Sequence, residues 1–186
     1  MRVTGGKARG IPLHAPAGGE TRPATDRMRE AVFSSLGAWI EGRSTADCFA
    51  GTGAYGLEAL SRGAAPVVFF ENSHRALACL RRNRAAVCRS GGFSAEDAPI
   101  KAGDIFRHGE RNDFAPELIF LDPPYATSPT LLPRLAELPL IAGAPANARL
   151  VIELPGNQEP RLPGWQCLRR IGKTGRDKPT AAILTR

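Results

Sequence analysis

Two kinds of hydrophobic pattern alternate along the chain from residue 44 onward. Short uninterrupted apolar runs are typical of strands buried on both faces of a sheet. Between them, apolar residues recur every three or four positions, as in amphipathic helices. The first pattern predicts strands over residues 46–50, 66–71, 117–122 and 148–154. Weaker signals indicate further strands near residues 99–101, 166–171 and 180–184. The second pattern predicts helices over residues 54–62, 73–89 and 129–138, and it also predicts one earlier helix over residues 25–37.

Strands that alternate with helices predict an α/β fold with a mainly parallel sheet. A length of 186 residues suits one domain with a short extension. We therefore expect an N-terminal basic arm and helix over residues 1–43, and a Rossmann-like domain over residues 44–186. The start of the chain has no apolar stretch typical of a secretory signal, and no run of apolar residues is long enough for a membrane span. A cytoplasmic protein without a membrane partner is expected.

Charge is distributed unevenly around a net value of +7. Residues 1–43 carry +3 and residues 161–186 carry +6, whereas residues 44–160 carry −2. Basic ends beside a nearly neutral middle favour a polyanionic partner such as nucleic acid. The alternative is a generally arginine-rich composition. The four cysteines form no Cys-x-x-Cys pair, and histidine is scarce, so no metal site is expected.

A glycine-rich motif lies between the first strand and helix of the predicted domain. Residues 51–56 read Gly-Thr-Gly-Ala-Tyr-Gly, which fits G-x-G-x-x-G with Gly51, Gly53 and Gly56. Glycines permit a tight turn and a close approach of ligand to backbone. Glu71 ends the next buried strand, where a carboxylate can accept hydrogen bonds from the ribose hydroxyls of an adenosine. The pattern predicts a nucleoside site, and the alternative is a structural glycine turn.

A second motif, formed by Asp122, Pro123, Pro124 and Tyr125, ends the buried strand over residues 117–122. The prolines stop the strand and stiffen its end. The Asp122 carboxylate and the Pro123 carbonyl can each accept one N–H of a planar amine, and the Tyr125 ring can stack on a base. This set favours S-adenosylmethionine over a dinucleotide as the ligand of the glycine loop. The alternative is a rigid turn with a capping aspartate.

Asp104 and Ile105 follow the weak strand near residue 100. Asp104 could accept a hydrogen bond from the adenine amino group, with Ile105 against the ring. A simple turn aspartate is the alternative.

Several segments together resemble the RsmD family of bacterial 16S ribosomal RNA guanine-N2 methyltransferases. They are Asp-Cys-Phe-Ala-Gly-Thr-Gly at 47–53, Gly-Leu-Glu-Ala-Leu-Ser-Arg-Gly-Ala at 56–64, Leu-Asp-Pro-Pro-Tyr at 121–125, and the arm segments 5–10 and 22–30. Residues 155–186 match less well. The resemblance implies a class I S-adenosylmethionine-dependent fold, whose sheet has seven strands with the last antiparallel. It also implies methyl transfer to one guanine of 16S ribosomal RNA. We expect a monomer without metal, whose substrate is this RNA, free or within a small-subunit assembly intermediate.

The implied site combines the motifs with the arm. Cofactor-binding residues are expected to be Asp47, Phe49, Gly51, Thr52, Gly53, Gly56, Glu71, Asp104 and Ile105. The basic residues of the arm and first helix surround short polar turns with few apolar anchors, so they could contact phosphates beside the active site. They are Arg2, Lys7, Arg9, Arg22, Arg27 and Arg29. The alternatives are a solvated arm and pairing of Arg29 with an acid.

Other functions share parts of these motifs. A nicotinamide-dependent oxidoreductase would use the glycine loop, but no chain remains for a second substrate domain. A non-enzymatic RNA-binding assembly factor would bind RNA without cofactor. DNA adenine-N6 and protein glutamine methyltransferases also use a Pro-Pro-Tyr loop. By resemblance, Asp rather than Asn at position 122 argues against the glutamine enzymes.

Overall fold

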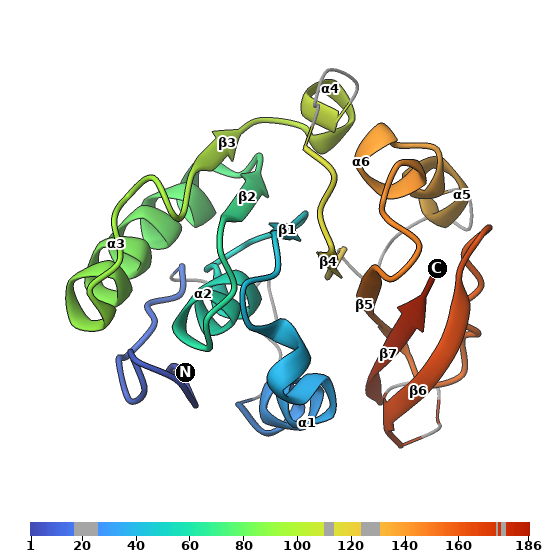
Figure 1. Cartoon of the computed structure of the whole chain (residues 1–186), viewed down its shortest axis with the longest axis horizontal. Helices are drawn as coiled ribbons and strands as arrows, with labels where there is room; N and C mark the ends of the chain where they lie inside the picture. The colour runs from blue at the N-terminus through green and yellow to red at the C-terminus, as the bar shows by residue number, and fades with distance from the viewer. Residues whose placement is uncertain (17–25, 110–113, 124–130, 174, 176–177) are drawn as a thin grey trace.

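A computed structural model describes residues 1–16, 26–109, 114–123, 131–173, 175 and 178–186. In these ranges a single seven-stranded sheet has the order β3-β2-β1-β4-β5-β7-β6 (Figure 1). The strands are β1 (Thr45–Asp47), β2 (Val67–Glu71), β3 (Ile100–Ala102), β4 (Leu118–Leu121), β5 (Arg149–Pro155), β6 (Gln166–Gly172) and β7 (Pro179–Thr185). The first five strands are parallel, and β7 runs antiparallel to both β5 and β6. The predicted class I Rossmann-like fold is confirmed.

Helices cover both faces of the sheet (Figure 1). They are α1 (Asp26–Leu36), the 3-10 helix η1 (Gly37–Ile40), α2 (Ala54–Ser61), α3 (His74–Gly91), α4 (Ile105–Gly109), α5 (Leu131–Ala136) and α6 (Pro139–Ala142). The side chains of α1–α3 share one hydrophobic cluster with the sheet, and those of α4–α6 share a second. None of the helices in the described ranges combines the length and apolar character that a membrane crossing requires.

Burial on both faces explains the uninterrupted apolar runs. All four residues of β4 are buried, and successive side chains point to opposite sides. Leu118 and Phe120 pack in the cluster with α1–α3, whereas Ile119 and Leu121 pack in the other. Two hydrophobic layers therefore leave no position in β4 for a polar residue.

Strand order places the ends of β1 and β4 at a switch point. From β1 the chain continues to β2 and β3 on one side, then returns to β4 on the other. Ligands of open parallel sheets bind beside the carboxyl ends of strands at this position. Four acids lie there: Asp47 ends β1, Glu71 ends β2, Asp122 follows β4 and Glu153 lies on β5. The register of β4 and β5 pairs Leu121 with Ile152, so the next residues of the two strands, Asp122 and Glu153, lie side by side.

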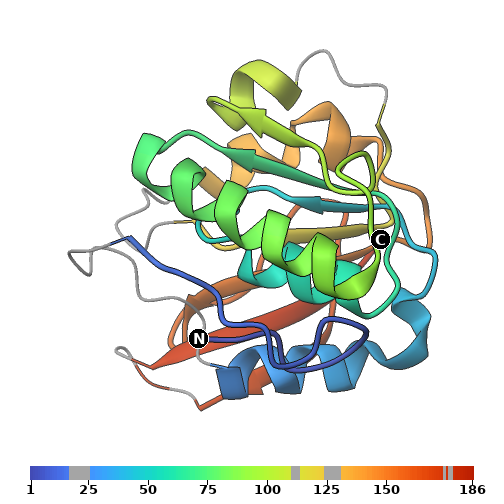
Figure 2. The same cartoon turned by 90° about the vertical axis from the view of Figure 1, so that its left-hand side faces the viewer.

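The N-terminal arm packs against the domain and runs beside α3 (Figure 2). Val3, Ala8 and Leu13 are buried and belong to the same cluster as α2 and α3. The expectation of few apolar anchors is therefore wrong. Residues 1–16 and the sheet share one core, so the division at residue 43 remains a prediction about function and does not describe packing.

Candidate active site

The glycine loop turns through two glycines in the left-handed region, with φ of +55° at Gly51 and +81° at Gly53. A Cβ at Gly53 would lie 2.4 Å from Leu80 Cδ1, so α3 closes one side of the loop. Around Gly51 the space is open, because the nearest atom to a Cβ would be the Phe49 carbonyl oxygen at 4.0 Å. A ligand can therefore approach the backbone at Gly51, whereas Gly53 is required by packing and by its φ angle.

Gly56 and Asp47 hold the helix that follows the loop. The Gly56 amide donates a hydrogen bond of 2.9 Å to Asp47 Oδ2, and a Cβ at Gly56 would lie 2.3 Å from the Phe69 ring. Asp47 is buried, and loss of hydration raises its pKa to about 7, with a further contribution from the negative charge of Glu71. In this structure Asp47 supports the start of α2, and a direct contact with cofactor remains a prediction.

Glu71 is held beside the loop by three backbone amides. Its Oε2 accepts from Gly51 N at 2.7 Å, and its Oε1 accepts from Asn72 N at 2.9 Å and Ser73 N at 2.7 Å. Two carboxylate oxygens can accept about four hydrogen bonds, so Oε2 retains capacity for one donor. A ribose hydroxyl fits this capacity. Binding both ribose hydroxyls would require one backbone bond to lengthen.

Asp122 lies at the end of β4, half-buried, and the neighbouring Pro123 is buried. Burial raises the pKa of Asp122 well above its ordinary value, and the charges of Glu153 and Asp47 raise it further. Pro124 and Tyr125, the other two residues of the predicted catalytic loop, lie outside the described residues. The part of the loop that is described therefore presents a carboxyl group whose neighbours are acidic.

Tyr55 and Glu153 extend this region, and our interpretation of the sequence gave neither of them a role. The Tyr55 ring is buried and stacks on Phe120, with centroids 4.9 Å apart. Its hydroxyl donates a 2.6 Å hydrogen bond to Glu153 Oε1. The sequence could have indicated Glu153, because it is a carboxylate within an otherwise apolar strand. Three acids of β1, β4 and β5 thus crowd together, which favours a cationic ligand because like charges repel in a partly dehydrated site.

Comparison with known proteins agrees with this geometry. A family model described as conserved hypothetical protein 95 matches residues 1–180. The chain belongs to this family, the RsmD family. The match extends through most of residues 155–186, where the resemblance was weaker. The predicted relationship is confirmed.

Individual relatives of this RsmD-family chain cover different shares of it. It is 36% identical over 133 residues to YlbH of Bacillus subtilis, a candidate rRNA methyltransferase, across 67% of each chain. It is 34% identical over 125 residues to ribosomal RNA small subunit methyltransferase D of Escherichia coli, across 67% of this chain and 60% of that one. A solved structure of yhhF, a candidate methyltransferase of Escherichia coli, is 31% identical with a TM-score of 0.82, covering 100% of this chain and 97% of the other.

The remaining predicted cofactor residues have defined places. Asp104 is exposed, and its Oδ1 accepts from Phe106 N at 3.0 Å at the start of α4. Ile105 is buried in the cluster with α5 and α6, and Phe49 is partly buried against the same cluster. Thr52 is buried between the loop glycines. The contact of Asp104 is that of a turn aspartate, and its role toward adenine stays a prediction.

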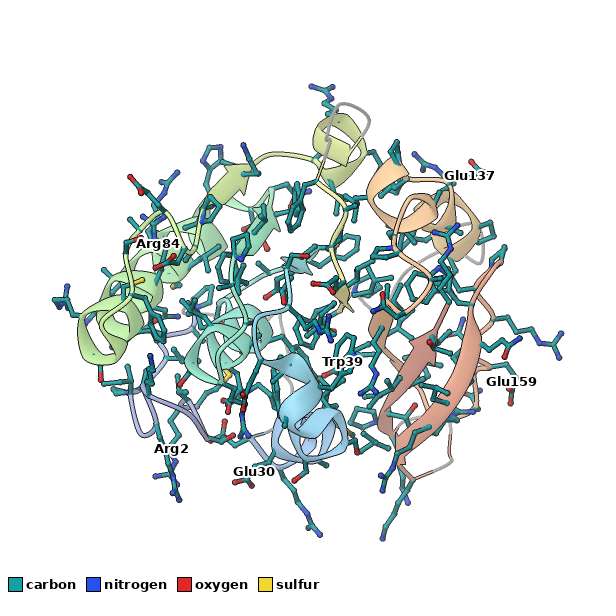
Figure 3. All side chains as sticks on the ribbon, in the orientation of Figure 1. Arg2, Glu30, Trp39, Arg84, Glu137 and Glu159 are labelled. Carbon is teal, nitrogen blue, oxygen red and sulfur yellow. The ribbon has the colours of Figure 1, made fainter. Side chains whose placement is uncertain are left out.

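The structure describes five of the six residues that were predicted to contact RNA, and four of these five are exposed. Arg2, Lys7, Arg9 and Arg27 are exposed, and Arg2 lies on the arm (Figure 3). Arg22 lies outside the described residues.

Arg29 is the exception among the described contacts, because it is fully buried. It is paired with Asp26 at 2.9 Å and with Glu58 at 3.4 Å, and it also donates to the Arg2 carbonyl. The prediction that Arg29 contacts RNA is corrected, since Arg29 is buried and its charge is paired with Asp26 and Glu58 inside the protein. Glu58 also accepts from Thr4 N at 2.7 Å, so Arg29 and Glu58 together hold the arm, α1 and α2.

Proposed function

We propose that this protein is an S-adenosylmethionine-dependent rRNA methyltransferase that modifies the exocyclic N2 amine of a guanine in 16S ribosomal RNA. Relatives at 34–36% identity carry the names of rRNA methyltransferases, one of them of the small subunit. The observation that carries the proposal is that Gly51, its hydrogen-bond partner Glu71, and Asp122 all lie at the edge of the sheet where the parallel strands end.

The cofactor fits the residues at this edge. Glu71 would hold a ribose hydroxyl, and the open backbone at Gly51 would admit the ligand. The acids Asp47, Asp122 and Glu153 would favour a ligand with positive charge over a neutral or anionic one. S-adenosylmethionine is a sulfonium cation, and when bound it supplies an electrophilic methyl group.

Asp122 would act on the amine that receives the methyl group. The nitrogen of an aryl amine is a poor nucleophile because its lone pair is delocalised into the ring. The Asp122 carboxylate and Pro123 carbonyl would each accept one N–H, which fixes the nitrogen and stabilises the positive charge that develops as the N–C bond forms. A proton must then leave this nitrogen. The ionised carboxylate of Asp122, which already accepts one N–H of this amine, is placed to accept that proton.

The ionisation of Asp122 would depend on whether the cofactor is bound, because the same charges act on both. In the free protein, burial and the charges of Glu153 and Asp47 favour the neutral form of Asp122. A cation bound beside the three acids favours the ionised form. The carboxylate would therefore be available to accept N–H bonds when cofactor is bound.

Methyl transfer to small subunits from cells that lack this protein tests the proposal. The subunits would be incubated with the protein and S-adenosylmethionine carrying a labelled methyl group, and the RNA digested to nucleosides for mass analysis. We expect label in N2-methylguanosine from 16S RNA, and much slower labelling when Asp122→Ala replaces the wild type. Label in N6-methyladenosine, or RNA binding without any labelled nucleoside, would contradict the proposal.

A further inference from the structure

A buried asparagine joins the N-terminal arm to the glycine loop. Asn83 lies on α3 and is completely inaccessible to solvent. Its Oδ1 accepts from His14 N at 2.8 Å, and its Nδ2 donates to His14 O at 2.9 Å and to Thr52 O at 2.9 Å. Both N–H groups of the amide and one acceptor position are therefore used. One side chain satisfies backbone groups of two segments that are 38 residues apart in the sequence.

Each end of this connection belongs to a different part of the candidate site. Thr52 lies between Gly51 and Gly53, the two glycines that turn the cofactor loop. His14 lies in the arm that carries the exposed residues Lys7 and Arg9, and its own side chain is exposed. The contact uses only the backbone of His14, so the identity of this side chain is irrelevant to it.

Attachment of the arm does not depend on Asn83 alone. Ser61, on α2, accepts from Ala8 N at 2.9 Å and donates to the Gly5 carbonyl at 2.6 Å. Like Asn83, Ser61 is buried and holds arm backbone by hydrogen bonds, but both of these bonds join α2 to the arm and bypass the glycine loop. The bond from Asn83 to Thr52 is therefore not needed to anchor the arm. It connects the arm to the glycine loop.

We propose that Asn83 is a positioning residue that couples the arm to the cofactor loop, so that cofactor binding and RNA contact by the arm strengthen each other. A shift of either segment would leave buried polar atoms of Asn83 without partners, so the two segments hold their positions together. Coupling of this kind is reciprocal, because the same free energy links the two binding events. The inference rests on the proposed function, in which the loop binds cofactor and the arm contacts RNA.

The backbone nature of the His14 contact gives a matched pair of variants. His14→Pro removes the backbone N–H that donates to Asn83 Oδ1, whereas His14→Ala keeps it. His14→Ala changes only an exposed side chain, whereas His14→Pro also removes one backbone N–H of the arm. Both are expected to fold, because the bonds of Ser61 to Ala8 and Gly5 still hold the arm. Asn83→Ala breaks the connection from the other side, and Ser61→Ala loosens the arm without touching the loop.

Calorimetric titration with S-adenosylhomocysteine measures the effect of the arm on the loop without RNA. We expect His14→Pro and Asn83→Ala to weaken binding by roughly three- to tenfold, and His14→Ala and Ser61→Ala to bind as the wild type does. Wild-type affinity in His14→Pro would overturn the inference. Equal weakening in His14→Pro and Ser61→Ala would overturn it too, because any loosening of the arm would then suffice.

The reciprocal measurement uses labelled transcripts of 16S ribosomal RNA with and without S-adenosylhomocysteine. We expect the wild type and His14→Ala to bind RNA more tightly when S-adenosylhomocysteine is present, and His14→Pro to show a smaller gain. An equal gain in both His14 variants contradicts coupling through Asn83. If no variant binds RNA while the S-adenosylhomocysteine affinities differ as expected, the proposed substrate is wrong and the connection between arm and loop stands.

Discussion

The Tyr55 hydroxyl donates a 2.6 Å hydrogen bond to Glu153, which links the helix after the glycine loop to the strand beside Asp122. Tyr55 also stacks on Phe120 of β4, so the ring and the hydroxyl fasten neighbouring strands to α2. The glycine loop and the end of β4 that carries Asp122 are thereby joined through the interior. This relationship implies that a residue inside the glycine motif supports the geometry of Asp122.

Replacement of the hydroxyl tests this support. Tyr55→Phe keeps the stacked ring and removes a hydrogen bond to a buried carboxylate, so we expect it to lower the free energy of unfolding by about 1–3 kcal/mol. Urea denaturation followed by circular dichroism measures the change. A midpoint and slope equal to those of the wild type would show that the bond contributes nothing to stability.

Cofactor affinity depends on Glu71 if its carboxylate receives a ribose hydroxyl. We expect Glu71→Ala to weaken binding of S-adenosylhomocysteine by about 1–3 kcal/mol, because it removes this acceptor and releases the Gly51 amide. Glu30→Ala, which removes an exposed acid of α1, is the control of equal charge (Figure 3). Calorimetry that finds equal affinity for the two folded variants would remove Glu71 from the site.

The raised pKa of Asp47 predicts a pH dependence of stability. An unfolded aspartate ionises near 3.8, whereas Asp47 in the folded protein ionises near 7, so the folded state binds more protons between these values. Stability contributed by this group is therefore complete below about pH 4 and decreases as pH rises toward 7, by up to ~1.4 kcal/mol per pH unit.

Asp47→Asn isolates that contribution, since its carbonyl oxygen can still accept from the Gly56 amide. Urea unfolding at several pH values between 4.5 and 7.5 should show that the variant gains stability relative to the wild type as pH rises. Parallel curves for the two proteins would mean that Asp47 ionises normally.

Exposed basic residues of the arm are expected to contact RNA phosphates. Combined replacement of Arg2, Lys7 and Arg9 by alanine should weaken RNA binding and reduce its salt dependence by roughly 0.7–0.9 in log–log slope for each phosphate that is no longer neutralised. Substitution is preferable to truncation, because truncation would remove Val3 and Leu13 from the core. Replacement of Arg81 and Arg89, exposed on α3, is the control, and an equal loss of slope there would argue against the arm as a specific contact.

Much of the fold could be predicted because β4 and its neighbours are buried on both faces, which leaves a clear apolar run in the sequence. The short helices α4 and α6 were missed, since four or five residues are too few to show helical periodicity. The glycine loop and Asp122 were predicted because each follows a strand with a local motif.

Interactions between distant segments could not be predicted in the same way. Tyr55 and Glu153 lie 98 residues apart, and no local pattern connects them. Arg29 has the sequence surroundings of a surface charge, because an arginine beside Arg27 shows no local sign of burial. Only the folded structure brings Glu58 to it and makes the pair possible.

Single-turnover methyl transfer to small subunits at saturating S-adenosylmethionine measures whether the Asp122 carboxylate stabilises the amine as it becomes cationic. This interaction strengthens toward the transition state, so Asp122→Ala should slow transfer by about a hundredfold or more while S-adenosylhomocysteine affinity stays near that of the wild type. Asp122→Asn, which keeps an acceptor oxygen without the charge, should fall between. A folded Asp122→Ala variant that transfers methyl at the wild-type rate would show that Asp122 does not stabilise this amine.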